Sequence, residues 1–195
     1  MQIIGKISPS AILDAYAISR EMLFSAIVHS TYAPSRQEAW HRTASNLQSE
    51  ATEKMWSLPD PHPRLVALAD RTLPSWHSML SCRGILANGS STSIEFHRDH
   101  RHFSPWAVML NLGEAFFFEE SPSGKFEFQI ENYDLKTRTK FTRTFKTNRT
   151  LLLPGQIIRF NSKLLHKAEQ LSVERYNHTF RHIKPKYIPK ITTLI

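Results

Sequence analysis

Apolar and polar positions follow two different patterns along this chain of 195 residues, and the change lies near residue 84. In the first half, Ser8 and Pro9 supply a cap and a first helical residue. Apolar positions then recur at helical spacing, which predicts a helix over about 9–24. After a proline-rich break, the apolar positions from Leu65 onward predict a second amphipathic helix that ends before Pro74.

The segment between these helices, 31–58, is polar and irregular and contains Trp40 and Trp56. Long connecting segments that carry aromatic residues are often lids or binding loops. We therefore expect this segment to form a lid or a substrate loop.

The second half consists of short β-like runs separated by turn residues such as Pro154 and Gly155. The expected strands are 106–112, 115–118, 126–130, 141–145, 150–153, 157–160 and 177–183. Many short strands at this spacing are typical of a double-sheet jelly roll. The sequence thus predicts an α+β, mainly β fold, in which the N-terminal helices pack on one sheet of the roll.

The chain shows no internal repeat and no domain boundary, so we expect a single domain over 1–195. Its expected parts are a helical N-terminal extension with the substrate lid (1–83), a jelly-roll core (84–183) and a basic tail (184–195).

The composition favours a protein that is neither exported nor inserted in a membrane. Hydrophobic residues make up 41% of the chain, but no apolar run approaches the roughly 20 residues that span a bilayer. The residues from Met1 to Lys6 lack the apolar region of a secretory signal. The expected location is cytoplasmic, or nuclear in a eukaryote. Cys82, the single cysteine, is expected to be a small buried hydrophobe and agrees with a reducing compartment.

The net charge of +8 fits a surface that binds a polyanion, because contacts from Lys and Arg to phosphates dominate nucleic-acid affinity. The same charge can serve solubility alone. The densest run, from Leu135 to Thr150, carries Lys136, Arg138, Lys140, Arg143, Lys146 and Arg149. This run is either a ribbon that follows phosphates or a charged hairpin that discourages edge pairing. A nucleic acid is the expected partner, and no partner protein is predicted.

His97, Asp99 and His166 form a candidate metal site. Alternate residues of a β-strand share a face, so His97 and Asp99 can project together, while the preceding strand, turn and strand allow His166 to return beside them. Two imidazoles and a carboxylate occupy one face of an octahedral Fe(II) ion and leave three positions for a co-substrate and O2. A His-x-Asp triplet alone is weak support, because it occurs by chance. Strand alternation places the neighbouring His100 and His102 on the opposite face.

The expected strand at 175–181 has two contrasting faces. Tyr176, His178 and Phe180 form an aromatic face suited to packing, and the other face consists of Arg175, Asn177, Thr179 and Arg181. If the polar face lines the roll, its guanidinium groups need anions, because a buried lone charge is very costly. Guanidinium binds carboxylate in a planar fork. Asp99 can neutralise part of this charge, which leaves 2-oxoglutarate as the second anion. The alternative is an edge strand with a solvated polar face.

These residues resemble the AlkB-like branch of the 2-oxoglutarate- and Fe(II)-dependent oxygenases. The most specific match is Arg175 to Arg181, which fits the AlkB string Arg-Tyr-Asn-x-Thr-Phe-Arg. His97-Arg98-Asp99, Met109 to Gly113 and Ala115 to Phe118 also match in outline. The specific matches cover 94–118 and 153–183.

The resemblance implies a double-stranded β-helix in which His97, Asp99 and His166 bind Fe(II). It further implies that the distal carboxylate of 2-oxoglutarate binds Arg175 and that the other end of the co-substrate lies near Asn177 and Arg181. The implied activity is oxidative demethylation or hydroxylation of a nucleobase in DNA or RNA, at the expense of 2-oxoglutarate and O2. The alternatives are hydroxylation of a small molecule or a protein side chain, and a non-catalytic jelly-roll binding module.

Two positions depart from the AlkB pattern. The family commonly has Asn-x-Tyr before the His-x-Asp motif, whereas this chain has Asn88-Gly89-Ser90, so Asn88 alone remains as a candidate contact to 2-oxoglutarate. AlkB-type repair enzymes often carry an acid two positions after the Asp, where this chain has Arg101, and a cation there fits poorly with a cationic methylated base. Arg101 is therefore a candidate substrate contact. Trp40 is a second candidate, either as an aromatic that stacks on a flipped base or as a packing residue.

Overall fold

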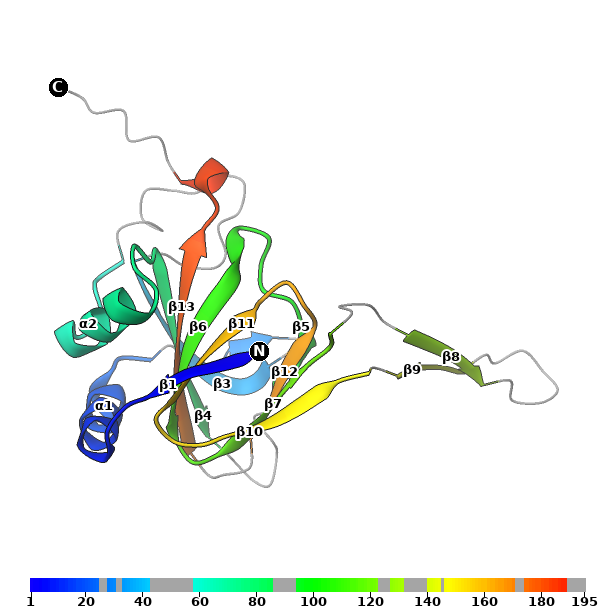
Figure 1. The fold of residues 1–195 in the computed structure, drawn as a ribbon, viewed down its shortest axis with the longest axis horizontal. Coiled ribbons are helices and arrows are strands. Elements are labelled where there is room, and N and C mark those ends of the chain that lie inside the picture. The colour runs from blue at the N-terminus through cyan, green and yellow to red at the C-terminus, as the bar shows by residue number, and fades with distance from the viewer. Residues whose placement is uncertain are drawn as a thin grey trace.

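The computed structural model describes residues 1–24, 28–30, 33–42, 58–85, 94–122, 127–131, 140–144, 146–170 and 174–188. Two antiparallel sheets face each other and form the core of a jelly roll (Figure 1). The predicted mainly β jelly roll with N-terminal helices on one sheet is therefore confirmed.

The larger sheet has the strand order β1-β11-β6-β13-β4-β3-β2. Its strands are β1 (Gln2–Lys6), β11 (Gln156–Asn161), β6 (Phe103–Gly113), β13 (Glu174–Ile183), β4 (Ser78–Ile85), β3 (Ala33–His41) and β2 (Val28–Ser30). The smaller sheet has the order β10-β7-β12-β5. Its strands are β10 (Asn148–Leu152), β7 (Phe116–Glu120), β12 (His166–Gln170) and β5 (Ile94–His97). A short 3-10 helix, η2 (Pro185–Tyr187), follows β13.

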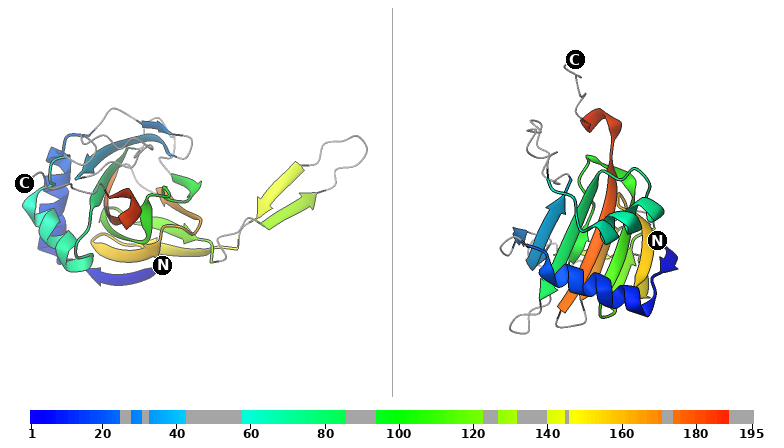
Figure 2. Two further views of the ribbon diagram at one scale, coloured as in Figure 1. Left: turned by 90° about the horizontal axis from the view of Figure 1, so that it is seen from above. Right: turned by 90° about the vertical axis from the view of Figure 1, so that its left-hand side faces the viewer.

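Two helices, α1 (Pro9–Glu21) and α2 (Pro63–Thr72), cover the outer face of the larger sheet (Figure 2). Helix α1 begins as predicted, because the Ser8 hydroxyl accepts a hydrogen bond from the Ala11 backbone N–H and Pro9 follows the cap. It ends at Glu21, one turn earlier than expected. Helix α2 ends before Pro74 as predicted.

Alternate residues of β13 serve the two sides of the larger sheet. Tyr176 and Phe180 pack in the apolar layer beneath the helices. His178, on the same face, is fully buried, and its two ring nitrogens are hydrogen-bonded to the hydroxyls of Ser19 on α1 and Ser81 on β4, at 2.8 and 2.7 Å. A second apolar layer fills the space between the two sheets with Ile94, Met109, Phe116, Phe118, Leu152, Ile158 and Phe160.

The expectation that 1–83 is a helical extension is wrong, because β1, β2, β3 and most of β4 lie in this range and belong to the larger sheet. The expected lid at 31–58 is also wrong in part. Residues 33–41 form β3, which pairs with β4 along Arg36 to His41. Its polar sequence concealed the strand, because Arg36 and Trp40 on this strand line a cavity instead of an apolar core. Residues 43–57, including Trp56, lie outside the described part of the chain.

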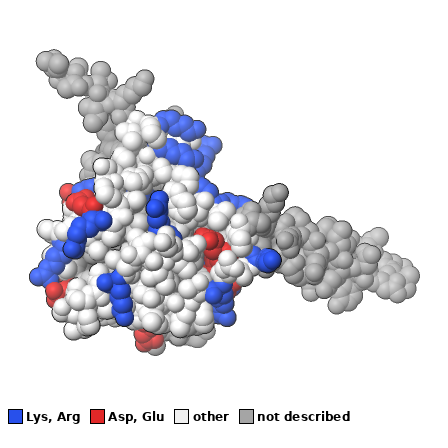
Figure 3. Space-filling view, in the orientation of Figure 1, with Lys and Arg blue, Asp and Glu red and all other residues white. Residues whose placement is uncertain are grey.

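The basic run between 135 and 150 contributes β9 (Lys140–Thr144), which pairs with β8 (Glu127–Glu131) in a separate two-stranded ribbon (Figure 1). Both interpretations of this run predict such a ribbon. On the face shown in Figure 3, the described Lys and Arg side chains lie in several groups with Asp and Glu among them. Neither described helix has the length and apolar character needed to cross a membrane.

Candidate metal centre

The ends of two paired strands bring two histidines together. His97 is the last residue of β5, His166 is the first residue of β12, and the two are partners in the antiparallel register. Asp99 follows two residues after His97, and its Oδ1 lies 3.8 Å from the Nε2 of each histidine. The ligand atoms of all three side chains lie within 4.8 Å of one another. The predicted convergence of these residues is therefore present.

The side chain of Asp99 is 7% exposed and is oriented by an ion pair with Arg181. The Nε of Arg181 donates a hydrogen bond of 2.7 Å to Oδ2, which leaves Oδ1 directed at His97 and His166. Burial by itself raises the pKa of Asp99, but the charge of Arg181 and its hydrogen bond to the carboxylate outweigh it and hold that pKa well below its usual range. Asp99 is therefore a carboxylate at neutral pH, as a metal ligand must be.

The tautomer of His166 is set by a backbone contact. Its Nδ1 lies 2.9 Å from the Leu164 carbonyl oxygen and donates to it, so Nε2 keeps a lone pair on the side of Asp99. Phe118 stacks on the ring and Phe160 meets it edge-on. Burial lowers the pKa of His166, which favours the neutral imidazole that binds a metal. Two such nitrogens and one carboxylate oxygen fit a divalent first-row cation such as Fe(II).

The loop that carries Asp99 is held by the turn between β11 and β12. The Asp99 backbone N–H donates to the Ser162 carbonyl at 2.9 Å. In the opposite direction, the Lys163 ammonium donates to the carbonyls of Asp99 and His100, at 3.2 and 2.6 Å. Arg98 completes the set with a hydrogen bond of 3.0 Å from its Nε to the Lys163 carbonyl. Four hydrogen bonds thus fix a ligand that lies beyond the end of its strand.

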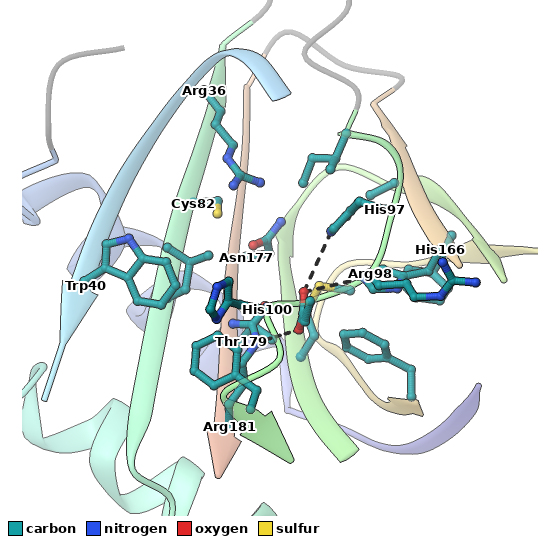
Figure 4. Close-up of a pocket in the computed structure, with 18 residues that line it drawn as sticks. Arg36, Trp40, Cys82, His97, Arg98, His100, His166, Asn177, Thr179 and Arg181 are labelled. Carbon is teal, nitrogen blue, oxygen red and sulfur yellow. Dashed lines mark hydrogen bonds and ion pairs between the residues drawn. The ribbon is translucent and has the colours of Figure 1, made fainter. Parts of the chain in front are cut away.

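A cavity of about 300 Å³ opens beside the three candidate ligands (Figure 4). Asn177, Thr179 and Arg181 of β13 form its polar wall, and Arg36 and Trp40 of β3 lie across from the metal centre. The rest of the lining is mainly apolar and includes Leu80, Cys82, Ile94, Met109, Phe118 and Phe160. The polar face of β13 therefore lies inside the roll, and the edge-strand alternative is wrong.

Arg175 lies on the same face of β13 and is 2% exposed. Its Nε and Nη1 have no hydrogen-bond partner among the described residues, and its guanidinium lies 4.3 Å from the centre of the Phe116 ring. Burial lowers its pKa to about 10, so the group remains charged at neutral pH. A buried guanidinium in this state is a receptor for an anion.

Comparison with known proteins agrees with this architecture. No protein-family model matches the sequence, and no curated protein matches it significantly. The structure is similar to a 2OG-Fe(II) oxygenase-family oxidoreductase from Burkholderia pseudomallei, with a TM-score of 0.56, 11% identity, and coverage of 90% of this chain and 79% of that chain. It is also similar to HygX from Streptomyces hygroscopicus with nickel and 2-oxoglutarate bound, with a TM-score of 0.51, 12% identity, and coverage of 92% and 80%. A third similar structure is the non-heme alpha-ketoglutarate-dependent epimerase SnoN from nogalamycin biosynthesis, with a TM-score of 0.53, 13% identity, and coverage of 92% and 77%.

The chain shares the jelly-roll fold of these enzymes. None of the three is described as an AlkB protein, so the narrower resemblance in sequence stays a prediction.

The structure places the other candidate residues in different surroundings. Trp40 lines the cavity and also stacks on Phe103, with ring centres 6.4 Å apart, so it is both a packing residue and a wall of the site. Arg101 is exposed in the turn after Asp99 and is not among the residues that line the cavity. Asn88 lies outside the described residues.

The expected position of His100 is wrong. Strand alternation placed it away from the metal ligands, but β5 ends at His97 and the chain then turns, so His100 lines the cavity. His102 is buried against Tyr187, with ring centres 4.2 Å apart. Cys82 is buried as expected and lines the cavity.

Two residues of the site were missed from the sequence. Arg36 lies in the segment expected to be a lid, and only the pairing of β3 with β4 shows that it faces the cavity. Lys163 lies in a turn, where a lysine is usually solvated. The alternation of Arg36, Glu38 and Trp40 was the available signal for Arg36, and no sequence signal identified Lys163.

Proposed function

We propose that the protein is an Fe(II)- and 2-oxoglutarate-dependent oxygenase. The observation that carries this proposal is the convergence of His97, Asp99 and His166 at the wall of a cavity. The polar strand of this cavity also carries Arg175, a cation with no anionic partner among the described residues. The fold similarity supports it, because the same jelly roll occurs in enzymes whose names include this chemistry.

The metal would be held by the Nε2 atoms of the two histidines and by Oδ1 of Asp99. Fe(II), when bound, would supply the O2-dependent oxidative decarboxylation of 2-oxoglutarate to succinate and carbon dioxide, coupled to hydroxylation of a substrate C–H bond, with one oxygen atom of O2 entering succinate and the other the new hydroxyl group. Arg175 would bind the distal carboxylate of the co-substrate, and the Asn177 amide would lie nearer its 2-oxo end. The apolar walls would keep water from the reacting centre.

A nucleobase in DNA or RNA is the proposed substrate. The AlkB-like string in β13 and the net charge of +8 support it. The position of Trp40 also supports it, because an aromatic wall opposite the metal can stack on an extruded base, an interaction worth about 1–3 kcal/mol. A carbon attached to nitrogen would be hydroxylated and then lost as an aldehyde, which is demethylation when that carbon is a methyl group.

Succinate formation tests the oxygenase proposal. Protein loaded with Fe(II) should convert 2-oxoglutarate to succinate, and His97→Ala or His166→Ala should abolish the conversion. His62→Ser is a matched control, because His62 is an exposed helix cap and serine also caps helices. Absence of succinate from the Fe(II)-loaded wild-type protein, both alone and with every substrate offered, would contradict the proposal.

The substrate is tested with a panel of methylated and unmodified oligonucleotides, followed by mass spectrometry of the nucleosides. A modified nucleoside that depends on 2-oxoglutarate is the expected result. Succinate formation without any change in the nucleosides would instead point to a small molecule or a protein side chain.

A further inference from the structure

A row of residues across the larger sheet places a second arginine opposite Arg175. The strand registers pair Arg36 of β3 with Gly84 of β4, Gly84 with Arg175 of β13, and Arg175 with Gly113 of β6. Arg36 itself lines the cavity and points from β3 toward Cys82 and Asn177 (Figure 4). On the face of the sheet that lines the interior of the roll, this row therefore consists of Arg36, Gly84, Arg175 and Gly113.

In this row, the residue between the two arginines is a glycine, Gly84. Adjacent strands lie about 4.8 Å apart, so the Cα atoms of Arg36 and Arg175 are separated by roughly 10 Å. Gly84 contributes no side chain to the space between them. Two long guanidinium side chains on either side of such a gap can both reach one small anion.

Among the described residues, the charges at this end of the site leave one cation in excess. Nη2 of Arg36 forms an ion pair with Oε1 of Glu38, and Arg181 is paired with Asp99. Arg175 has no such partner among the described residues, and the Nε of Arg36 is buried without a hydrogen bond there. The two arginines lie close enough to interact electrostatically. Burial is the main cause that lowers the pKa of Arg175, and the positive charge of Arg36 lowers it further. One carboxylate would balance the excess charge and occupy the open N–H groups.

We propose that Arg36 and Arg175 together bind the distal carboxylate of 2-oxoglutarate, with Glu38 orienting Arg36. This inference rests on the proposed function and adds a second residue to co-substrate recognition. Glu38 Oε2 also accepts a hydrogen bond of 3.0 Å from the Trp40 indole N–H. The three side chains on the cavity side of β3 thus form one connected unit that links the co-substrate end of the cavity to Trp40.

Calorimetry with two 2-oxo acids tests this assignment. The metal is Mn(II) without oxygen, so no turnover occurs, and the ligands are 2-oxoglutarate and 2-oxopentanoate, which has the same length but no distal carboxylate. Arg36→Met should weaken 2-oxoglutarate binding about tenfold or more, as expected for loss of a charged hydrogen bond. Binding of 2-oxopentanoate should stay unchanged, which also shows that the variant is folded. Arg159→Met, an exposed arginine on β11, is the matched control.

A double variant separates recognition from simple charge neutralisation. Arg36→Met leaves Glu38 as an extra negative charge, whereas Arg36→Met with Glu38→Gln keeps the net charge of the site unchanged. If Arg36 binds the carboxylate, the double variant should remain as weak for 2-oxoglutarate as the single variant. Wild-type affinity in the double variant would overturn the inference, as would a loss seen with Arg175→Met but not with Arg36→Met. The proposed function itself fails if the wild-type protein with Mn(II) binds neither ligand.

Discussion

Replacing Arg181 with methionine perturbs the centre at its best-defined contact. The Nε of Arg181 lies 2.7 Å from Oδ2 of Asp99, and the two side chains are 8% and 7% exposed. Removal of one partner from a pair buried to this degree costs about 3–5 kcal/mol, because a lone charge remains. Burial raises the pKa of Asp99 once its counter-ion is gone, so the carboxyl can take up a proton and limit the loss.

We therefore expect Arg181→Met to lower the free energy of unfolding of the metal-free protein by about 3 kcal/mol. For a chain of this length, this corresponds to a decrease in Tm of about 6–12 °C. Thermal unfolding followed by circular dichroism in the presence of EDTA measures the decrease. Arg159→Met, on the exposed surface of β11, should change Tm by far less.

A divalent cation is the alternative counter-ion for Asp99, so metal should offset the loss. A ligand that binds only the folded state stabilises it by RT ln(1 + [L]/Kd). Saturating Mn(II) should accordingly raise the Tm of Arg181→Met more than that of the wild-type protein. The double variant with Asp99→Asn should lose this response. The reasoning would be refuted if the Tm of Arg181→Met in EDTA lay within about 2 °C of the wild-type value and Mn(II) raised the Tm of both proteins equally.

Three other changes have defined outcomes. Burial lowers the pKa of His178 to about 3, so below about pH 6.5 the unfolded chain binds a proton that the folded protein does not. The free energy of unfolding of the wild-type protein should therefore fall by about 2 kcal/mol between pH 6.5 and 5. In urea unfolding, His178→Gln should lack this part of the pH dependence. Lys163→Met should weaken Mn(II) binding about tenfold in calorimetry, because the ammonium holds the Asp99 and His100 carbonyls, and Lys163→Arg should restore part of it. Trp40→Ala should weaken binding of a single-stranded oligonucleotide by about 1–3 kcal/mol in a fluorescence titration, with Trp40→Phe closer to wild type.

Each of these has a contradicting result. Equal pH slopes for wild type and His178→Gln would show that the pH dependence arises elsewhere, for example at His41, whose charge also acts on His178. Unchanged Mn(II) affinity in Lys163→Met would show that the Ser162 contact alone positions Asp99. Unchanged oligonucleotide binding in Trp40→Ala would leave that residue as packing for Phe103.

The sequence predicted the elements whose two faces differ in character. Strand β13 is the best case, because Tyr176 and Phe180 meet an apolar layer while Asn177 and Thr179 face a polar cavity, and the alternation is visible in the sequence. Strand β3 is the opposite case. Its cavity face is polar and its stability comes from pairing with β4, so no apolar alternation marks it as a strand. The helix cap at Ser8 could be predicted because it depends only on neighbouring residues in the sequence.

The predicted position of His100 was wrong for a different reason. Alternation holds only while the chain remains extended, and β5 ends at His97. The contacts that place Asp99 come from Ser162 and Lys163, more than sixty residues later in the sequence. Local patterns carry no information on such contacts, so the ligand triplet could be predicted while the geometry of its loop could not.

The two arginines of β13 show how the opposite sheet decides what identical side chains do. Arg175 and Arg181 lie on the same face of one strand, so sequence pattern alone gives them equivalent roles. Across from Arg181 lies Asp99. This carboxylate neutralises the charge of Arg181, and the hydrogen bond from Arg181 orients it. Across from Arg175 lies the ring of Phe116, which offers no anion, while the neighbouring Arg36 is already paired with Glu38. Among the described residues, the unbalanced charge is therefore at the Arg175 end, which favours the proposed carboxylate recognition there and leaves Arg181 to support the candidate metal ligand.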